Sequence, residues 1–129
     1  MEFISTPQAS APGGHYAQAV ADHGFLFVSG QLPVAVSGIH AEPQPMAGQA
    51  RLALANLLAI VAAAGCQRED IIKVTVYVVG VEHWAEFNRV YALAMGSHTP
   101  ARAIVPVPAL HHGYLVEIEA VVRHQASRP

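Results

Sequence analysis

The sequence of 129 residues has the length of one folded domain, and its composition excludes several classes of protein. Apolar residues make up 53% of the chain and charged residues 12%, which excludes intrinsic disorder. The formal net charge is −2, and the seven Lys and Arg residues form no basic stripe, so we expect no binding to nucleic acid. Soluble domains typically contain about 25% charged residues. The shortage suggests that part of the apolar surface lies in contacts between subunits.

No feature of the sequence predicts membrane insertion or secretion. Met1–Ser5 has neither the basic nor the apolar region of a signal peptide. The apolar run Leu52–Ala64 is interrupted by Asn56 and is too short to span a bilayer. Cys66 is the only cysteine and cannot form an intramolecular disulfide. We therefore predict a cytoplasmic protein without membrane contact. Neither a linker nor a repeat divides the sequence, which predicts a single domain over residues 1–129.

The N-terminal third is predicted to form a hairpin followed by a loop. Two short apolar strands, Tyr16–Ala21 and Phe25–Ser29, flank a turn at Asp22–Gly24. Residues 30–45 form a loop that is rich in proline and glycine, with a short strand expected near Ile39.

Two helices are predicted from apolar side chains at helical spacing. The first begins at Pro45 and ends at Gly65, and its apolar stripe consists of Ala50, Leu54, Leu57, Val61 and Ala64. Gln49, Arg51 and Asn56 lie off this stripe. The second helix covers Glu82–Met95, ends at Gly96 and has on its core side Trp84, Phe87, Tyr91 and Ala94.

Three further strands complete the predicted fold. Ile71–Val79 is rich in β-branched residues, and its aliphatic face consists of Ile72, Val74, Val76 and Val78. Ala101–Val105 is expected at a sheet edge because Pro106 cannot donate a hydrogen bond, and Leu115–Arg123 is the last strand. The order β-β-α-β-α-β-β predicts an α+β fold, a mixed sheet with two helices packed on one face. The opposite face then needs cover, which a homo-oligomer would supply.

Arg102 is the only Asp, Glu, Lys or Arg residue between Arg89 and Glu117. A guanidinium in an apolar strand requires an anion, because burying it unpaired is costly. Two partners satisfy this requirement. One is a structural ion pair with Glu117 or Glu119, and the other is the carboxylate of a ligand, which the planar guanidinium can bind through two parallel hydrogen bonds.

Glu117 and Glu119 are two residues apart on a predicted strand, so both side chains project from the same face. They are either the solvated face of an edge strand or include a general base whose pKa is raised by partial burial. Asn88 lies on the apolar stripe of the second helix and must be hydrogen-bonded there, either as a structural clamp or to a ligand.

The eight histidines do not predict a metal site. His111 and His112 are adjacent, so their side chains diverge, and no HxxxH motif or Cys/His cluster is present. The sequence also lacks the glycine-rich motifs of nucleotide binding and the GxSxG motif of hydrolases. We expect neither a metal nor a cofactor.

Six motifs resemble, in order and spacing, those of the RidA/YjgF family, and they extend from about residue 16 to residue 122. They are Phe27–Pro33, Gln49–Arg51 with Leu54 and Asn56, Lys73–Val76, Phe87–Tyr91, Pro100–Arg102 and Val116–Ala120. The last two motifs are the most specific. The resemblance implies a chorismate-mutase-like subunit and a homotrimer, with the sheets lining a central barrel, the helices outside and a ligand pocket at each subunit interface.

The resemblance also implies roles for individual residues. Arg102 matches the arginine that holds the substrate carboxylate, and Glu117 matches the acidic residue that holds the attacking water. The positions that match the lining of the pocket are Tyr16, Ser29, Gly30 and Asn88. Ile104 occupies a pocket position where many members have cysteine, and His15 stands where proline is common. The loop at residues 106–114 is unusual for the family and leaves the substrate side chain open.

The reaction implied by the resemblance is hydrolytic deamination of reactive 2-imino (enamine) acids, such as 2-aminoacrylate, to 2-keto acids and ammonia. Two functions other than deamination are also considered for this chain. One is non-catalytic binding or sensing of small carboxylates, which also requires Arg102. The other is ribonuclease activity, attributed to some relatives but disfavoured here by the acidic charge and the lack of a basic aromatic groove.

Overall fold

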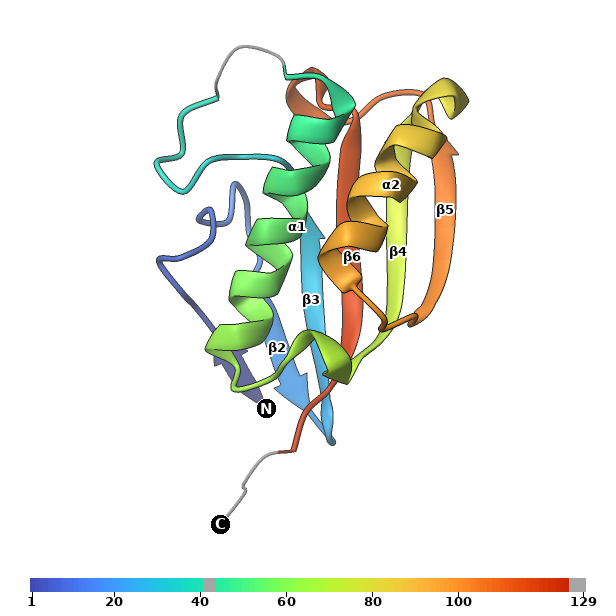
Figure 1. Ribbon diagram of the computed structural model, residues 1–129. Coiled ribbons are helices and arrows are strands. Elements are labelled where there is room, and N and C mark those ends of the chain that lie inside the picture. Colours follow the sequence, from blue (N-terminus) through green and yellow to red (C-terminus); the bar gives the residue numbers. More distant parts are fainter. Residues whose placement is uncertain (41–43, 126–129) are drawn as a thin grey trace.

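The computed structural model describes residues 1–40 and 44–125, which form one sheet covered by two helices on one face (Figure 1). The strands are β1 (Glu2–Ile4), β2 (Ala19–Asp22), β3 (Phe25–Gln31), β4 (Ile71–Val79), β5 (Ala101–Val107) and β6 (Val116–Arg123). The helices are α1 (Met46–Ala63) and α2 (Trp84–Met95), with short 3-10 turns η1 (Arg68–Asp70), η2 (Val81–His83) and η3 (His111–Gly113). The sheet order is β1-β2-β3-β6-β4-β5, with β4 and β5 parallel and the other neighbours antiparallel. The predicted α+β layer is confirmed.

The core lies between the sheet and the helices because side chains alternate along each strand. On β6 the residues facing the helices are almost fully buried: Val116, Ile118, Ala120 and Val122. The residues between them, Glu117, Glu119 and Val121, lie on the opposite face and are only partly buried. This face of the sheet, which we call the open face, carries no helix in the described part of the chain (Figure 1).

The hairpin is confirmed, but its first strand begins later than predicted. His23 and Gly24 form a tight turn in which both residues have positive φ, 51° and 83°. β2 begins at Ala19, and Tyr16 precedes it with its side chain half exposed. The chain bends at the Gly13–Gly14 pair, and the N–H of Tyr16 donates to the carbonyl of Gly14 at 3.0 Å. Ile39 forms no strand, and residues 41–43 of the predicted loop lie outside the described residues.

The predicted aliphatic face of β4 is wrong at its first position. The pairing of β4 with β6 shifts between Ile71 and Lys73, where the strand is irregular. This shift places Ile71 in the core and leaves Ile72 exposed. At the other edge, β5 continues through Pro106 to Val107, two residues further than predicted. Proline is tolerated because β5 pairs only with β4 and is an edge strand, as predicted.

Gly65 and Gly96 follow the two helices with positive φ, as predicted, but some side chains differ from expectation. Trp84 is the first residue of α2 and is 47% exposed rather than in the core. Gln49 and Asn56, expected off the buried stripe, are almost fully buried. Their amides are hydrogen-bonded to the backbone, so the burial of these polar groups is compensated.

α1 is the one described helix that is long and apolar enough to cross a membrane by composition alone. However, 56% of its apolar window is buried inside the molecule, and the helix packs against β3, β6 and α2. It is therefore the core helix of this fold.

Candidate active site

A β-bulge in β3 forms the first part of the site. Val28 pairs with Ala120 and Gln31 pairs with Ile118, so three steps along β3 match two steps along β6. The extra residue lies at Ser29–Gly30. Bulges bend a strand and redirect its side chains, and they are frequent next to functional sites.

Ser29 links the segment before β2 to this bulge through two hydrogen bonds. Its N–H donates to the carbonyl of Gln18 at 3.0 Å, and its hydroxyl donates to the carbonyl of Ala17 at 2.7 Å. These bonds hold the neighbouring Tyr16 beside the end of β3. The Tyr16 hydroxyl accepts a hydrogen bond from the N–H of Gly13 at 3.2 Å, which closes the bend in this segment.

The Glu117 carboxyl lies directly over Gly30. A Cβ atom at residue 30 would lie 2.8 Å from Oε2 of Glu117, a distance that real Cβ atoms essentially never show. A side chain at residue 30 would therefore displace the Glu117 carboxyl from its present position. Partial burial raises the pKa of Glu117 above its ordinary value, and Glu119 raises it further, whereas the nearby His111 lowers it.

These residues line a cavity of about 370 Å³ on the open face. Its lining consists of Gly13, Gly14, Tyr16, Ser29, Gly30, Leu32, His111, His112 and Glu117. Four of the predicted site residues, Tyr16, Ser29, Gly30 and Glu117, are thus brought together. A hollow of about 570 Å³ at the other end of the molecule contains none of the predicted residues.

Glu119 differs from Glu117 although both project from the same face of β6. The hydroxyl of Tyr77 donates a hydrogen bond to Oε1 of Glu119, and this bond raises the pKa of Tyr77. Glu119 does not line the cavity. Of the two carboxylates, only Glu117 is placed to act on a molecule in the cavity.

Arg102 forms the second part of the site, on β5 at the far edge of the sheet. It pairs with Val74 and therefore faces the helices, where its NH1 donates to Oδ1 of Asn88 at 2.8 Å. Its guanidinium carbon lies 4.8 Å from the ring centroid of Tyr91, a cation–π contact. Asn88 and Tyr91 are one turn apart on α2, so this helix holds both an edge and a face of the guanidinium. Ile104 lies on the same face of β5 and packs against the core.

No carboxylate within the described residues lies within 4.0 Å of Arg102. The structural ion pair with Glu117 or Glu119 is therefore not formed inside this chain. In addition, the buried hydroxyl of Tyr91 has no hydrogen-bond partner among the described residues. The guanidinium keeps donors that can bind an anion from outside the chain.

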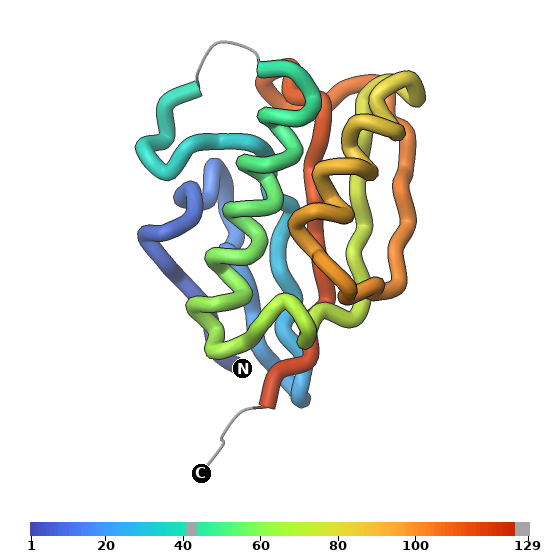
Figure 2. Tube along the Cα trace, in the orientation of Figure 1, coloured from blue at the N-terminus to red at the C-terminus, as the bar shows by residue number. Residues whose placement is uncertain are grey.

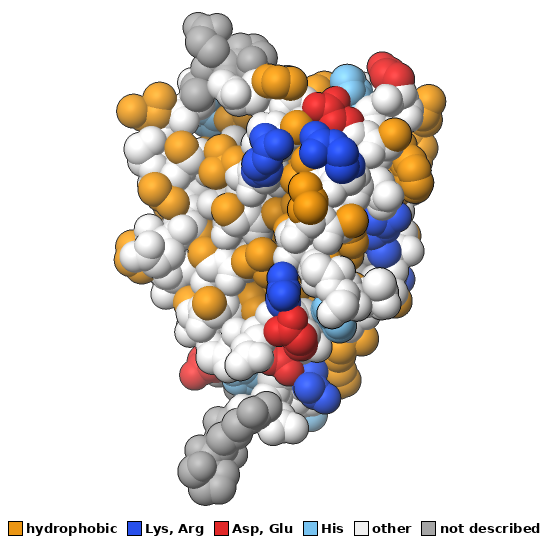
Figure 3. Space-filling view, in the orientation of Figure 1, with side chains coloured by type: hydrophobic (Ala, Val, Ile, Leu, Met, Phe, Trp, Pro, Cys, Tyr) orange, Lys and Arg blue, Asp and Glu red, His pale blue; other side chains and the backbone are white. Residues whose placement is uncertain are grey.

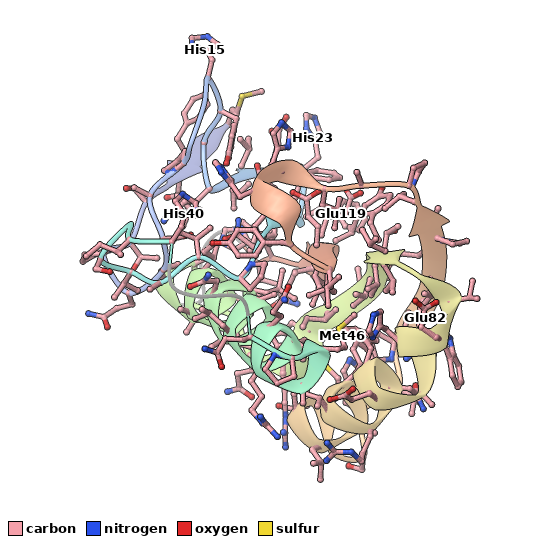
Figure 4. All side chains as sticks on the ribbon, turned by 90° about the horizontal axis from the view of Figure 1, so that it is seen from above. His15, His23, His40, Met46, Glu82 and Glu119 are labelled. Atoms are coloured by element: carbon pink, nitrogen blue, oxygen red, sulfur yellow. The ribbon has the colours of Figure 1, made fainter. Side chains whose placement is uncertain are left out.

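The predicted site residues thus form two groups on opposite faces of the sheet. Glu119, on the open face with Glu117, lies on the side of the sheet away from the helices (Figure 4). Arg102, Asn88 and Ile104 lie on the helix side, near the β5 edge. Within one chain the predicted carboxylate anchor and the predicted base do not meet.

Sequence reasoning missed two contributors to these groups. Tyr91 was assigned to the core, although its spacing of three residues from Asn88 could have indicated a shared role. By sequence His111 belongs to an unusual loop and to no metal-binding motif, and the structure adds that it lines the cavity with Glu117. Within the described residues, no group of three His, Cys, Asp or Glu side chains could hold a metal ion.

A family model described as Endoribonuclease L-PSP matches residues 6–124 of the chain. The chain belongs to this family, which includes the RidA/YjgF proteins. A RutC family protein of Pyrococcus horikoshii is 40% identical over 120 residues, which cover 93% of this chain and 95% of the relative. A rat protein named 2-iminobutanoate/2-iminopropanoate deaminase is 37% identical over 93% of this chain and 88% of its own length.

Solved structures of the RidA/YjgF proteins have the same fold. The structure of TdcF from E. coli, which contains bound serine, superposes with a TM-score of 0.91 at 36% identity and covers 97% of this chain and 100% of its own. RidA from a Psychrobacter species gives a TM-score of 0.90 at 32% identity, over 95% of this chain and 99% of its own. These matches agree with the six sequence motifs.

Proposed function

We propose that this chain catalyses the hydrolytic deamination of 2-imino acids to 2-keto acids and ammonia, at sites formed between subunits. The observation that carries the proposal is the separation of Arg102 from Glu117. The Arg102 guanidinium has donors free for a carboxylate, and Glu117 lines a cavity. Within one chain, however, the proposed anchor and the proposed base do not meet. The names of the mammalian relatives support the reaction, and the serine bound to TdcF supports recognition of small carboxylic acids that carry nitrogen on C2.

A homotrimer would complete both halves. The open face carries a row of paired apolar residues, Phe3, Val20, Phe27 and Val121, and the phenylalanines are 69% and 49% exposed. Large apolar side chains in a continuous exposed row are typical of an association surface. In our proposal the open faces of three chains line a central barrel, and the β5 edge of one chain lies beside the cavity of the next.

The proposed reaction divides its roles between two subunits. Arg102 of one subunit binds the substrate carboxylate with the guanidinium donors that Asn88 does not occupy. Glu117 of the neighbouring subunit accepts a proton from water, and the water oxygen attacks C2 of the C=N bond. The resulting carbinolamine is protonated on nitrogen, the C–N bond breaks, and ammonia leaves as C2 becomes a ketone. Orientation and base catalysis suffice, so the proposed reaction uses no metal or cofactor.

The decisive experiment generates 2-aminoacrylate in situ with a dehydratase and follows pyruvate formation. The purified protein should accelerate the appearance of pyruvate beyond the rate in buffer. An equal rate with and without protein, together with tight binding of 2-keto acids, would instead favour the carboxylate-binding protein. We further propose a cytoplasmic, single-domain protein that binds neither membrane nor nucleic acid. Among the described residues visible in Figure 3, the Lys and Arg side chains on the helix face are separated by neutral and acidic groups.

A further inference from the structure

A second, smaller cavity of about 160 Å³ adjoins the cavity that contains Glu117. Five residues line both cavities: Gly13, Tyr16, Gly30, Leu32 and His112. The two cavities are therefore neighbouring compartments of one depression. The smaller compartment extends away from Glu117, toward His40 and the loop that follows β3.

Three aromatic side chains from two separate segments meet at this compartment. The ring centroids of His40 and His112 are 4.0 Å apart, and Nδ1 of His40 lies 2.6 Å from the hydroxyl of Tyr114. His40 belongs to the loop after β3, whereas His112 belongs to the η3 turn and Tyr114 follows that turn, before β6. Figure 2 shows these segments meeting at the end of the molecule opposite the N-terminus.

His112 adopts a left-handed backbone conformation, which is uncommon for residues other than glycine, although histidine adopts it more often than most. Its φ is 61° and its ψ is 15°. The turn thereby holds the imidazole of His112 at the boundary of both cavities. A strained residue that lines a cavity is a candidate for function, because the strain persists only where the surrounding structure maintains it.

Several polar groups of the smaller compartment can donate hydrogen bonds, among them His40, His112 and Tyr16. In the described part of the chain no Asp or Glu lines it. Imidazoles can donate N–H hydrogen bonds in either protonation state. The Tyr16 hydroxyl accepts from Gly13 and keeps its own hydrogen for a ligand. The side-chain amide of Gln18 is already hydrogen-bonded to the backbone of Thr6 and Ser10, so it is not available to a ligand. A ligand that complements this compartment brings acceptors, and the strongest are the oxygens of a carboxylate.

We infer that this compartment is the side-chain pocket of the substrate and that it favours imino acids whose short side chain ends in a carboxylate. The inference rests on the proposed function. Glu117 and the backbone at Gly30 would face C2 of the substrate, while its side chain passes Tyr16 and reaches His40 and His112. About 160 Å³ corresponds to roughly five water-sized groups at about 30 Å³ each, which fits a side chain of four or five non-hydrogen atoms.

The test compares, by titration calorimetry, the binding of 2-oxoglutarate with that of 2-oxohexanoate, a keto acid of similar length whose side chain is uncharged. The native protein should bind the diacid about tenfold more tightly or better, as expected for one or two charge-assisted hydrogen bonds. His112→Asn and His40→Asn should each reduce this ratio toward one. Asparagine suits the backbone at residue 112, because it tolerates the left-handed region.

His23 provides a matched control. It is also a histidine with positive φ, 51°, but it lies at the hairpin turn and is absent from the lining of both cavities (Figure 4). His23→Asn should leave the ratio unchanged. Equal binding of the two keto acids by the native protein, or a ratio that survives both His112→Asn and His40→Asn, would overturn the inference. Turnover of 2-aminoacrylate by the same preparation would then still support the proposed function.

Discussion

At the scale of single residues, the Glu117 carboxyl is partly buried and forms no hydrogen bond with another described residue. Its oxygens lie over Gly30 beside a cavity, whereas Glu119 is held by the hydroxyl of Tyr77. A base needs access to water and a pKa that is not depressed, and partial burial raises the pKa of Glu117. The two glutamates of β6 are therefore chemically different although they share one face.

This difference predicts unequal effects of two conservative substitutions. Glu117→Gln should retain keto-acid binding and lose most of the turnover, by about 100-fold or more as for removal of a general base. Glu119→Gln should reduce turnover much less, because it alters the contact with Tyr77 and only the smallest of the influences on the pKa of Glu117. Steady-state kinetics of both variants with in situ 2-aminoacrylate makes the comparison. Equal losses would show that the assignment of the base is incorrect.

The raised pKa of Glu117 also predicts a dependence of stability on pH. The folded chain binds this proton more tightly than the unfolded chain, whose carboxyl has the ordinary value of 4.5. The carboxylate therefore costs no stability below that pH and destabilises the fold as the pH rises through the raised pKa. Glu117→Gln removes this cost, so its melting temperature should rise relative to the parent between pH 4 and pH 7.

Both proteins in this comparison should carry Arg102→Ala, so that a guanidinium from a neighbouring subunit does not contribute. Glu69→Gln is the control with the opposite sign. A hydrogen bond from Arg68 lowers the pKa of Glu69, so the native carboxylate stabilises the fold above its ordinary pKa and loses this contribution as the pH falls. The melting temperatures of Arg102→Ala with and without Glu117→Gln are compared at each pH. A difference between them that stays the same across the pH range would contradict the prediction.

Arg102 should be required for the ligand and not for the fold. Arg102→Ala should abolish measurable deamination and weaken keto-acid binding by about 2–5 kcal/mol, the usual cost of removing one partner of a buried charged pair. Arg102→Lys should recover little, because an ammonium cannot form two parallel hydrogen bonds. Melting temperature and turnover are measured on the same samples. A large loss of melting temperature with normal turnover per folded molecule would indicate a structural role instead.

At the scale of secondary-structure elements, polar side chains on the buried side of α1 fix the loops around the site. The Asn56 amide donates to the carbonyls of Leu32 and Val34 at 3.2 and 2.9 Å. Gln49 accepts from the N–H of Leu115, just after the η3 turn. These bonds hold to α1 the two segments that form the smaller cavity, so the helix acts as the support of the site.

Asn56→Ala should therefore destabilise the protein by about 1–3 kcal/mol, because it leaves two carbonyl groups without their partner. Arg51→Ala, on the exposed side of the same helix, should change stability by less than about 0.5 kcal/mol. Thermal or urea unfolding of the two variants gives the comparison. Similar small changes would show that the loop is held by other contacts.

The elements were largely predictable because their signals are local. Glycines after both helices and β-branched residues in β4 act over a few residues, so periodicity and end signals were sufficient. β1 was missed because three residues carry no recognisable period. Ile72 was misplaced because an irregularity in strand pairing depends on the partner strand, which alternation along one strand cannot reveal.

Without the family resemblance, candidate site residues could be inferred only where charge or an isolated polar group was informative. Arg102 stands alone in an apolar stretch, and its need for an anion follows from that isolation. The role of Gly30 depends on the register of β3 with β6, and the contact of Arg102 with Tyr91 depends on the packing of α2 against β5. These distances arise between segments far apart in sequence, so they cannot be derived from composition or from the spacing of residues along the chain.

At the scale of the whole molecule, the sheet separates Arg102 from Glu117, and a symmetric assembly would be a way to bring the proposed anchor and base together. A ring of identical chains can place the same edge of each subunit beside the same cavity of the next. The apolar row on the open face, which includes Phe27 and Val121, would be buried inside such a ring. The assembly would then provide both the cover for the sheet and the complete set of groups.

This arrangement predicts complementation between two inactive variants. Arg102→Ala lacks the anchor and Glu117→Gln lacks the base, but a mixed assembly can unite the intact Arg102 of one chain with the intact Glu117 of another. In a random one-to-one mixture each requirement is met with a probability of one half, so about a quarter of the interfaces should carry both groups. The variants are unfolded together, refolded and assayed with 2-aminoacrylate.

The recovered activity should approach about a quarter of the native value, whereas each variant refolded alone should remain inactive. Light scattering on the same samples should give a mass of about 41 kDa, three times the 13.7 kDa of the chain. If both groups acted within one chain, no mixed assembly could contain a complete site. Absence of recovery in a verified mixed trimer would therefore exclude a site shared between Arg102 and Glu117 of different subunits, and a monomeric mass would exclude the assembly itself.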